Sequence, residues 1–289
     1  MQIHANLKCL IHHSLRSSVQ IAMKSYPCCP TDRPALPGEM KSTLDGKTVS
    51  ISNNSLLPFD CYIVGNSQNW IVLIYDIFGM HPNKFEFADW VSKNTDLSVA
   101  VPDVRRSHNW PRDQYPPAND DIKKAFYTWL DKEGSPKERG KETRATIDHV
   151  IDQLGAQSVS LVGYCWGAKV VSLVDAYRNV QSLVFVHPSF LKSEDGEKQT
   201  VPTLMMPAME DNLTQYMAGA LRNRHGARFI ISENYLGTFH GFMGARGQWN
   251  KPEERPYVEK AKSEITQFVL EQTGSAKASA RTTTTTTSA

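Results

Sequence analysis

The sequence predicts an α/β fold, built on a single doubly wound, mostly parallel sheet with helices on both faces. Strand-like and helix-like segments alternate between about residues 48 and 272, a pattern typical of such sheets. Several strand candidates are uninterrupted apolar runs, including 71–74 and 183–186, as expected for parallel strands covered on both faces. Hydrophobic residues make up 40% of the 289-residue chain, which is enough for a sizeable core.

The predicted elements follow one another along the chain, with no internal repeat. Short apolar segments predict strands at 49–52, 61–64, 70–76, 98–103, 158–164, 182–187, 203–207 and 227–233. Amphipathic spacing predicts helices at 83–94, 121–132, 142–154, 168–177, 213–223 and 256–272. Asp120-Asp121 and Asp211-Asn212 supply N-caps for two of these helices. In a sheet of this kind, ligands bind at the carboxyl ends of the strands.

The two ends of the chain differ from its middle, so we expect one domain over 46–273. We expect residues 1–45 to form a flexible arm and residues 274–289 to form a disordered, Thr-rich tail. The first 22 residues are basic and acid-poor, as a mitochondrial transit segment is. There are two alternatives. Translation starts at Met23 and the residues before it come from a wrongly assigned start, or the segment is an ordinary disordered arm.

Composition excludes several classes of partner. The formal charge of +2 is nearly balanced and indicates no nucleic acid partner. No apolar run approaches the ~18 residues of a membrane span. Five irregularly spaced cysteines indicate a reducing compartment rather than a disulfide framework. We therefore expect a cytoplasmic protein, or a mitochondrial one if a transit segment is present. We also expect a monomer. Cys28-Cys29 and His12-His13 lack metal-site spacing, and we expect no metal.

The segment 163–167 reads Gly-Tyr-Cys-Trp-Gly and stands between a strand candidate and a helix candidate. This is the G-x-nucleophile-x-G elbow of an α/β-hydrolase, with Cys165 where serine usually stands. The two glycines relieve clashes in a tight strand-to-helix turn. The N-terminus of the following helix favours thiolate over thiol. The alternative is a buried structural cysteine that packs as a small hydrophobe.

An acid and a base follow the cysteine in the order that this fold uses. Asp211 stands just past a strand candidate and is the predicted acid, with Glu210 as the local alternative and an N-cap as the other role for Asp211. His240 lies in a glycine-flanked loop before the last helix and is the predicted base. His187 also follows a strand but precedes the acid, so it is out of order.

Acyl transfer also needs donors for the developing oxyanion. The backbone N–H of Trp166, directly after the nucleophile, is one candidate, and that of Ile77, after an early strand, is the other. Asp76 at the same strand end either keeps the thiol protonated by repulsion or pairs with a nearby arginine. The aromatic, basic loop 105–117 is either a substrate lid or wall, or a proline-stiffened connection.

Five motifs together resemble the dienelactone hydrolase (carboxymethylenebutenolidase) family, and its fungal branch in particular. In order over about residues 45 to 272, they are Tyr-Asp-Ile-Phe-Gly at 75–79, Val-Pro-Asp at 101–103, Gly-Tyr-Cys-Trp-Gly at 163–167, His-Pro-Ser-Phe at 187–190 and His-Gly-Phe at 240–242. The resemblance implies a single-domain α/β-hydrolase without metal or organic cofactor. It also implies a triad of Cys165, His240 and Asp211 that opens a small unsaturated lactone through a thioester-type acyl intermediate. Asp76 matches a strand-end carboxylate that the family links to thiol activation, but it is one methylene shorter than the bacterial Glu.

The family binds a substrate carboxylate with arginines, whose fork matches a carboxylate. One of these normally lies four or five residues after the histidine. Here Gly244 takes the four-residue position and Arg246 lies six residues on. The substrate-binding residues that the resemblance suggests are Arg105, Arg106, Arg246, Trp166 and Phe242.

The sequence therefore predicts a cysteine-dependent hydrolase that opens a small activated lactone or ester. One alternative is a broad carboxylesterase or lactonase with the same triad and a different pocket. The other is a non-catalytic member of the fold that binds ligands or senses redox state through Cys165.

Overall fold

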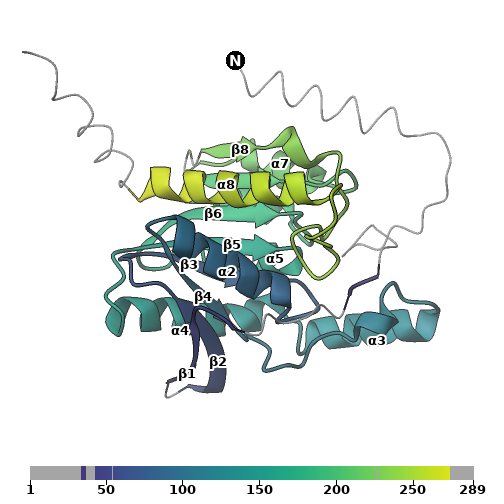
Figure 1. Cartoon of the computed structure of the whole chain (residues 1–289). Coiled ribbons are helices and arrows are strands. Elements are labelled where there is room, and N and C mark those ends of the chain that lie inside the picture. The colour runs from purple at the N-terminus through teal and green to yellow at the C-terminus, as the bar shows by residue number, and fades with distance from the viewer. Residues whose placement is uncertain (1–33, 37–42, 54, 225, 227, 274–289) are drawn as a thin grey trace, which may run out of the picture.

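The computed structural model describes residues 34–36, 43–53, 55–224, 226 and 228–273, and an eight-stranded sheet runs through the molecule (Figure 1). The strands lie in the order β1-β2-β4-β3-β5-β6-β7-β8. The pairs β1–β2 and β2–β4 are antiparallel, and the remaining pairs are parallel. Their bounds are β1 Lys47–Asn53, β2 Leu56–Val64, β3 Asn69–Ile74, β4 Ser98–Pro102, β5 Ser158–Tyr164, β6 Val180–Val186, β7 Thr203–Met206 and β8 Phe229–Ile231.

Helices cover both faces of this sheet. Two 3-10 turns lie at Arg112–Gln114 and Glu233–Tyr235. The α-helices are α2 Pro82–Asn94, α3 Asp120–Asp131, α4 Pro136–Asp152, α5 Trp166–Ser172, α6 Ser193–Lys198, α7 Thr214–Ala220 and α8 Arg255–Gln272. Helices α2 and α8 cover one face, and α4 and α5 cover the other (Figure 1). The mostly parallel α/β fold predicted from the alternating segments is confirmed.

Buried side chains form two apolar clusters, one on each face of the sheet. Along β3, Ile71 and Leu73 belong to the cluster under α2 and α8, whereas Val72 and Ile74 belong to the cluster under α4 and α5. Successive residues of a strand point to opposite faces, so a strand covered on both faces needs apolar residues throughout. This is the physical reason for the uninterrupted apolar runs in the sequence.

The predicted strands are all present, but several helix boundaries differ. Helix α4 begins at Pro136 rather than 142, with proline in its first turn, where a missing N–H costs nothing. Helix α5 ends at Ser172 rather than 177, and the short α6 was not predicted. Helix α3 is capped by Asn119, whose side chain accepts the Ile122 N–H, and not by the predicted aspartates.

One piece of the predicted N-terminal arm is docked on the domain. Leu36 donates its N–H to the Ala245 carbonyl at 2.8 Å, and its own carbonyl lies 3.2 Å from His81 Nε2. Ala35 packs against the buried cluster under α4 and α5. Residues 34–36 of the predicted arm thus contact the domain, and the division of the chain stays a prediction. The proposed transit segment, the Cys28-Cys29 and His12-His13 pairs and the Thr-rich tail lie outside the described residues.

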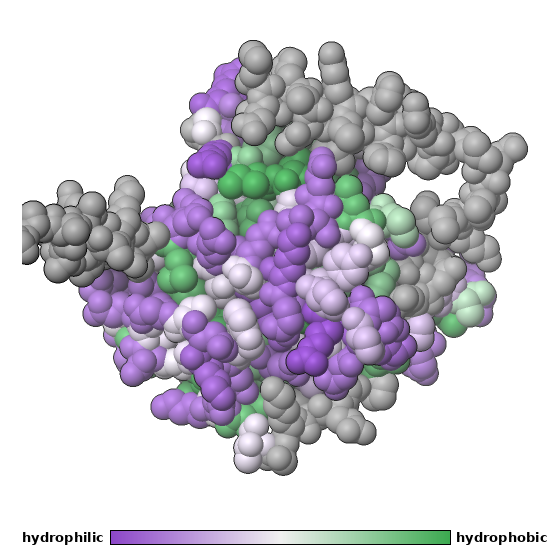
Figure 2. All heavy atoms as spheres, turned by 45° about the horizontal axis from the view of Figure 1, so that its top comes forward, coloured by the Kyte–Doolittle hydropathy of each residue, from purple (hydrophilic) through white to green (hydrophobic). Residues whose placement is uncertain are grey.

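One face of the molecule is largely polar where its residues are described. Figure 2 shows hydrophilic side chains over most of the face that it presents, with apolar groups in small separate patches. Among the helices that the structure describes, none is long and apolar enough to cross a membrane. The described ranges also contain no group of three or more His, Cys, Asp or Glu side chains that could hold a metal ion.

Candidate active site

Cys165 stands at the turn between β5 and α5 with φ 54° and ψ −114°. This conformation is costly for a residue with a side chain, on the order of 1–3 kcal/mol. The flanking glycines make the turn possible. A Cβ on Gly163 would lie 2.5 Å from the Ala168 nitrogen, and one on Gly167 would lie 2.3 Å from the Ile74 carbonyl oxygen. The steric role predicted for both glycines therefore holds, and the elbow packs directly on the end of β3.

The predicted acid and base meet in a buried contact. His240 Nδ1 lies 2.5 Å from Asp211 Oδ1, and the two side chains are 0% and 1% exposed. A carboxylate only accepts hydrogen bonds, so Nδ1 carries a proton in this contact. The other carboxylate oxygen accepts the Ala208 N–H at 2.8 Å. Asp211 is not a helix cap, because α7 begins at Thr214 and has Leu213 as its N-cap residue.

The segment after β6 lies between Cys165 and this pair. Ser189 Oγ is 3.6 Å from Cys165 Sγ, and the Ser189 N–H donates to the Cys165 carbonyl at 3.1 Å. The His187 ring packs edge-on against the His240 ring, with centroids 5.0 Å apart. Strands β5, β6 and β7 are neighbours, so the segments that follow them, with Cys165, with His187 and Ser189, and with Asp211, lie at one edge of the sheet.

The sequence analysis does not predict Ser189 and His187 as site residues. Both lie between Cys165 and Asp211 in the chain, outside the order of nucleophile, acid and histidine on which the prediction rests. The signal that could have found them is the strand order, since the segment after β6 adjoins the segment after β5.

The two predicted oxyanion donors follow paired positions on neighbouring strands. Ile74 of β3 is aligned with Gly163 of β5, and Ile77 and Trp166 each lie three residues further along. Within the described chain, neither backbone N–H donates a hydrogen bond to another residue, although the Ile77 carbonyl accepts the Trp110 N–H at 3.1 Å. Buried N–H groups are normally paired, so these two are available for a developing negative charge.

Asp76 pairs with a lysine rather than with an arginine side chain. Lys84 Nζ lies 2.9 Å from Asp76 Oδ2, and both side chains are buried. Burial by itself would raise the pKa of Asp76, but the Lys84 charge and the Ala245 N–H hold this pKa below its ordinary value. The arginine partner that the sequence offered as one alternative is thus replaced by Lys84, and the effect of Asp76 on the thiol stays a prediction. The cation was not predicted because Lys84 lies on α2, away from every quoted motif.

Arg105 is fully buried beside the elbow. Its guanidinium lies 4.4 Å from the Trp166 ring and 4.8 Å from the Tyr75 ring. Nη2 donates to the Asp76 carbonyl at 2.9 Å and to Asn109 Oδ1 at 2.8 Å. Nη1 is buried without a hydrogen-bond partner among the described residues. Burial lowers the pKa of Arg105, partly offset by Tyr75 and Asp76. This leaves one buried, cationic donor next to Trp166.

The other two arginines predicted to bind substrate, Arg246 and Arg106, have different surroundings. Arg246 is buried, with its guanidinium 4.9 Å from the Phe78 ring and 5.2 Å from the Tyr115 ring. Arg106 is held elsewhere, because it pairs with Glu142 at 2.8 Å and donates to the Leu57 and Pro58 carbonyls.

The Phe242 ring stacks on Tyr235 at 5.3 Å and belongs to the cluster under α2 and α8. Phe242 and Arg106 thus make contacts within the fold, and their substrate roles stay predictions.

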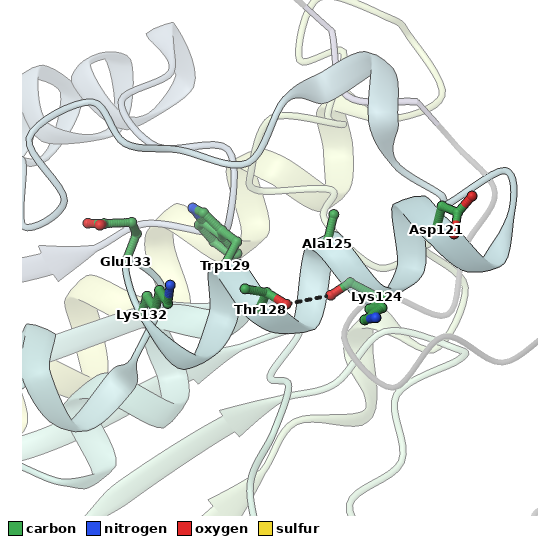
Figure 3. A pocket seen from close by; sticks show the side chains of 7 residues that line it. All are labelled: Asp121, Lys124, Ala125, Thr128, Trp129, Lys132 and Glu133. Carbon is green, nitrogen blue, oxygen red and sulfur yellow. Dashed lines mark hydrogen bonds between the residues drawn. The ribbon is translucent and has the colours of Figure 1, made fainter.

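A surface groove lies away from this site. It measures about 440 Å³ and runs along one face of α3 (Figure 3). Its described lining comes from α3 and the turn after it, so it is an open groove rather than an enclosed pocket. Trp129 links the groove to the site, since its ring lies 5.2 Å from the Arg105 guanidinium. Cys165, only 1% exposed, does not line it. The site is therefore closed in the conformation described.

The architecture is that of the α/β-hydrolase fold, with a glycine-flanked cysteine turn after β5 and a buried Asp–His pair whose acid follows β7. The dienelactone hydrolase family model matches residues 59–274. The chain therefore belongs to the dienelactone hydrolase family, as the five motifs predicted, and the class of protein is a hydrolase.

Curated relatives support the same family. An uncharacterised AIM2 family protein of Schizosaccharomyces pombe is 27% identical over 241 residues, which are 81% of this chain and 94% of the relative. The carboxymethylenebutenolidase homologue of Mus musculus is 26% identical over 205 residues, covering 69% and 80% of the two chains. The first match agrees with the predicted fungal branch.

Solved structures share the fold at low identity. A dienelactone hydrolase-like promiscuous phosphotriesterase from metagenomic libraries superposes with a TM-score of 0.57 at 13% identity, covering 80% of this chain and 99% of its own. An esterase of Pyrococcus furiosus superposes with a TM-score of 0.53 at 10% identity, covering 83% and 97%. At these identities the likeness concerns the fold alone.

Proposed function

We propose that this protein is a cysteine-dependent hydrolase that opens small activated lactones or esters. The observation that carries the proposal is the buried contact between His240 Nδ1 and Asp211 Oδ1, at the sheet edge where the strained Cys165 elbow also lies. A nucleophile, a base and a group that orients the base are the three parts that nucleophilic acyl transfer requires. The names of the mouse relative and of the esterase neighbour agree with an ester or lactone substrate.

In the acylation step, His240 Nε2 takes the thiol proton and Cys165 Sγ attacks the carbonyl carbon. The carbonyl π electrons move to oxygen, and the Trp166 and Ile77 N–H groups stabilise the oxyanion. The tetrahedral intermediate then collapses. The ring or ester C–O bond breaks, the leaving oxygen takes a proton from His240, and the acyl group stays on sulfur as a thioester.

In the deacylation step, His240 takes a proton from water and the hydroxide attacks the thioester carbonyl. The C–S bond breaks, Cys165 Sγ takes the proton from His240, and the carboxylic acid is released. Asp211 holds the imidazole in the tautomer that both steps need. Activated lactones and esters have a better leaving group than amides, so they are the expected substrates.

Arg105 is the preferred receptor for a substrate carboxylate. Its buried Nη1 has no partner among the described residues, and its guanidinium lies over Trp166, the residue after the nucleophile. A guanidinium matches a carboxylate geometrically. Arg246, over the Phe78 and Tyr115 rings, is the second candidate. We therefore favour lactones or esters with a free carboxylate over a broad esterase range.

The deciding experiment measures hydrolysis of an aryl ester by wild type, Cys165→Ala and Cys61→Ala, each with and without prior iodoacetamide. Cys61 is the matched control because it is an equally buried thiol in β2. We expect Cys165→Ala and alkylation to abolish turnover while Cys61→Ala retains it. A folded wild type that reacts with iodoacetamide at Cys165 but hydrolyses no activated ester would favour a binding or redox-sensing protein instead.

A further inference from the structure

The ion pair of Asp76 and Lys84 has no place in the triad chemistry. Both side chains are nearly fully buried, and Asp76 is the one ion-pair partner of Lys84 within the described chain. Burial lowers the pKa of Lys84, and Asp76 opposes this shift. A buried ion pair often stabilises a fold no better than apolar residues of similar size. Its presence beside the nucleophile therefore suggests a role other than stability.

Asp76 joins two loops of the site through its two carboxylate oxygens. Oδ1 accepts the Phe78 N–H at 3.0 Å, which fixes the turn after β3. Oδ2 accepts the Ala245 N–H at 2.9 Å, in the loop that follows His240. A Cβ on Gly244 would lie 2.2 Å from Oδ2, so only glycine at this position allows the second loop to reach the carboxylate.

Two residues in the first turn of α2 contact Asp76 and the loop that follows His240. Lys84 Nζ contacts Asp76 Oδ2, the oxygen that also accepts the Ala245 N–H. The neighbouring Asn83 donates from Nδ2 to the Gly244 carbonyl at 2.8 Å and to the Gly247 carbonyl at 3.0 Å. The carboxylate thus accepts hydrogen bonds from a buried lysine and from two backbone N–H groups.

The peptide unit that joins Asp76 to Ile77 is also held by hydrogen bonds to its carbonyl oxygen. Its carbonyl accepts Arg105 Nη2 at 2.9 Å and the Gly79 N–H at 3.2 Å. A peptide unit is planar, so fixing the Asp76 carbonyl also fixes the direction of the Ile77 N–H. That N–H is one of the two proposed oxyanion donors.

We propose that the Asp76–Lys84 pair is a positioning device for the oxyanion site, which holds the Ile77 N–H in place by tying the turn after β3 to the loop after His240. The inference rests on the proposed function, because an oxyanion forms only if Cys165 attacks a carbonyl. Asp76 and Lys84 themselves touch no reacting atom. They act through the Ile77 peptide, and their loss affects transition-state binding rather than thiol reactivity.

The test compares wild type with Asp76→Asn/Lys84→Met. The double variant keeps the volume of both side chains and leaves no uncompensated buried charge, but its amide offers one acceptor where the carboxylate offers two. Lys262→Met is the matched control, since Lys262 is an equally buried lysine on α8. Asp76→Asn alone is the second variant if the double variant does not fold.

Two quantities are measured on each folded protein. The first is the affinity for an aryl trifluoromethyl ketone, to which Cys165 Sγ adds to form a hemithioketal whose oxyanion occupies the proposed site. The second is the rate of Cys165 alkylation by iodoacetamide, a reaction that forms no oxyanion. We expect the ketone affinity of the double variant to fall by about 10²-fold, while its alkylation rate and both values for Lys262→Met stay within about threefold of wild type.

Unchanged ketone affinity would overturn the inference, and so would a parallel loss of affinity and alkylation, because the pair would then act on the thiol. Failure of the proposed function can be told apart from failure of this inference. A wild type that binds the ketone but hydrolyses no ester would contradict the proposed hydrolase activity. The ketone affinity of the variants would still decide the role of the Asp76–Lys84 pair.

Discussion

Two buried thiols in the same apolar cluster have opposite surroundings. Cys61 and Cys165 are 0% and 1% exposed, and both belong to the cluster under α4 and α5. Cys61 lies in regular extended backbone, paired with Val49 of β1 and Pro102 of β4. Burial raises the pKa of this thiol far above its ordinary value. Nothing in its surroundings favours the thiolate strongly enough to offset that effect.

Cys165 differs in its position along the chain rather than in its burial. It stands past the end of a strand with φ 54°, next to the Ser189 hydroxyl and at the edge where Asp211 and His240 meet. The comparison teaches that burial alone does not decide what a cysteine does. A strand interior surrounds a thiol with apolar neighbours, whereas a strand end brings it to the polar loops of neighbouring strands.

The largest expected effect concerns the residue that orients the base. In Asp211→Asn the amide oxygen would accept the Ala208 N–H and the amide NH2 would face His240 Nδ1. This donor selects the other imidazole tautomer, and we expect kcat to fall by about 10³–10⁴-fold with little change in KM. Steady-state kinetics on an aryl ester measures the effect, with Glu210→Gln as the matched control on the neighbouring residue. If Glu210→Gln lost more activity than Asp211→Asn, the acid would be wrongly assigned.

The elbow itself can be broken without touching the thiol. Gly167→Ala places a Cβ 2.3 Å from the Ile74 carbonyl oxygen, so we expect a loss of about 2–3 kcal/mol in unfolding free energy together with lost activity. In Gly140→Ala the nearest atom, Arg144 Nη1, would lie 3.4 Å away. This helical control should be neutral or stabilising by up to about 1 kcal/mol. Equal stability of the two variants in urea denaturation would show that the elbow tolerates a side chain.

The raised pKa of Cys61 predicts a pH dependence of stability. Above about pH 8.5 the unfolded chain loses the Cys61 proton, while the folded protein keeps it because burial raises that pKa. The folded state then binds more protons, so stability falls as pH rises, by up to about 1.4 kcal/mol per pH unit from this group. Cys61→Ala should show a shallower decline between pH 8.5 and 10 in urea denaturation. Parallel declines for the variant and wild type would contradict the assigned environment.

The smallest expected effect concerns the hydroxyl beside the nucleophile. Ser189→Ala removes a group 3.6 Å from Cys165 Sγ. A lost hydrogen bond to a charged or polarisable partner is worth about 1 kcal/mol, so we expect the Cys165 alkylation rate to change by roughly threefold to tenfold. Peptide mapping after timed iodoacetamide exposure measures the change site by site. An identical rate would mean that Ser189 only fixes the backbone, through its N–H bond to the Cys165 carbonyl.

Local pattern was a reliable guide to the sheet and a poorer one to helix ends. Continuous apolar runs locate β3, β5 and β6 because both faces of those strands are covered. Helix α4 was predicted to start six residues too late, since the turn from Pro136 is charged and contains Gly140. The side chain of Arg144 and that of Val174 lie near this glycine, and such tertiary contacts are absent from any local pattern.

The sequence by itself determined the fold class, the family and the order of Cys165, Asp211 and His240, because elbow glycines and strand-end positions are properties of neighbouring residues. Tertiary structure decided the rest. It paired Asp76 with Lys84, placed Ser189 beside the thiol, and turned Arg106 toward Glu142. These contacts join segments that the linear pattern treats as independent. Which strands lie side by side, and therefore which loops meet, depends on how the whole chain packs.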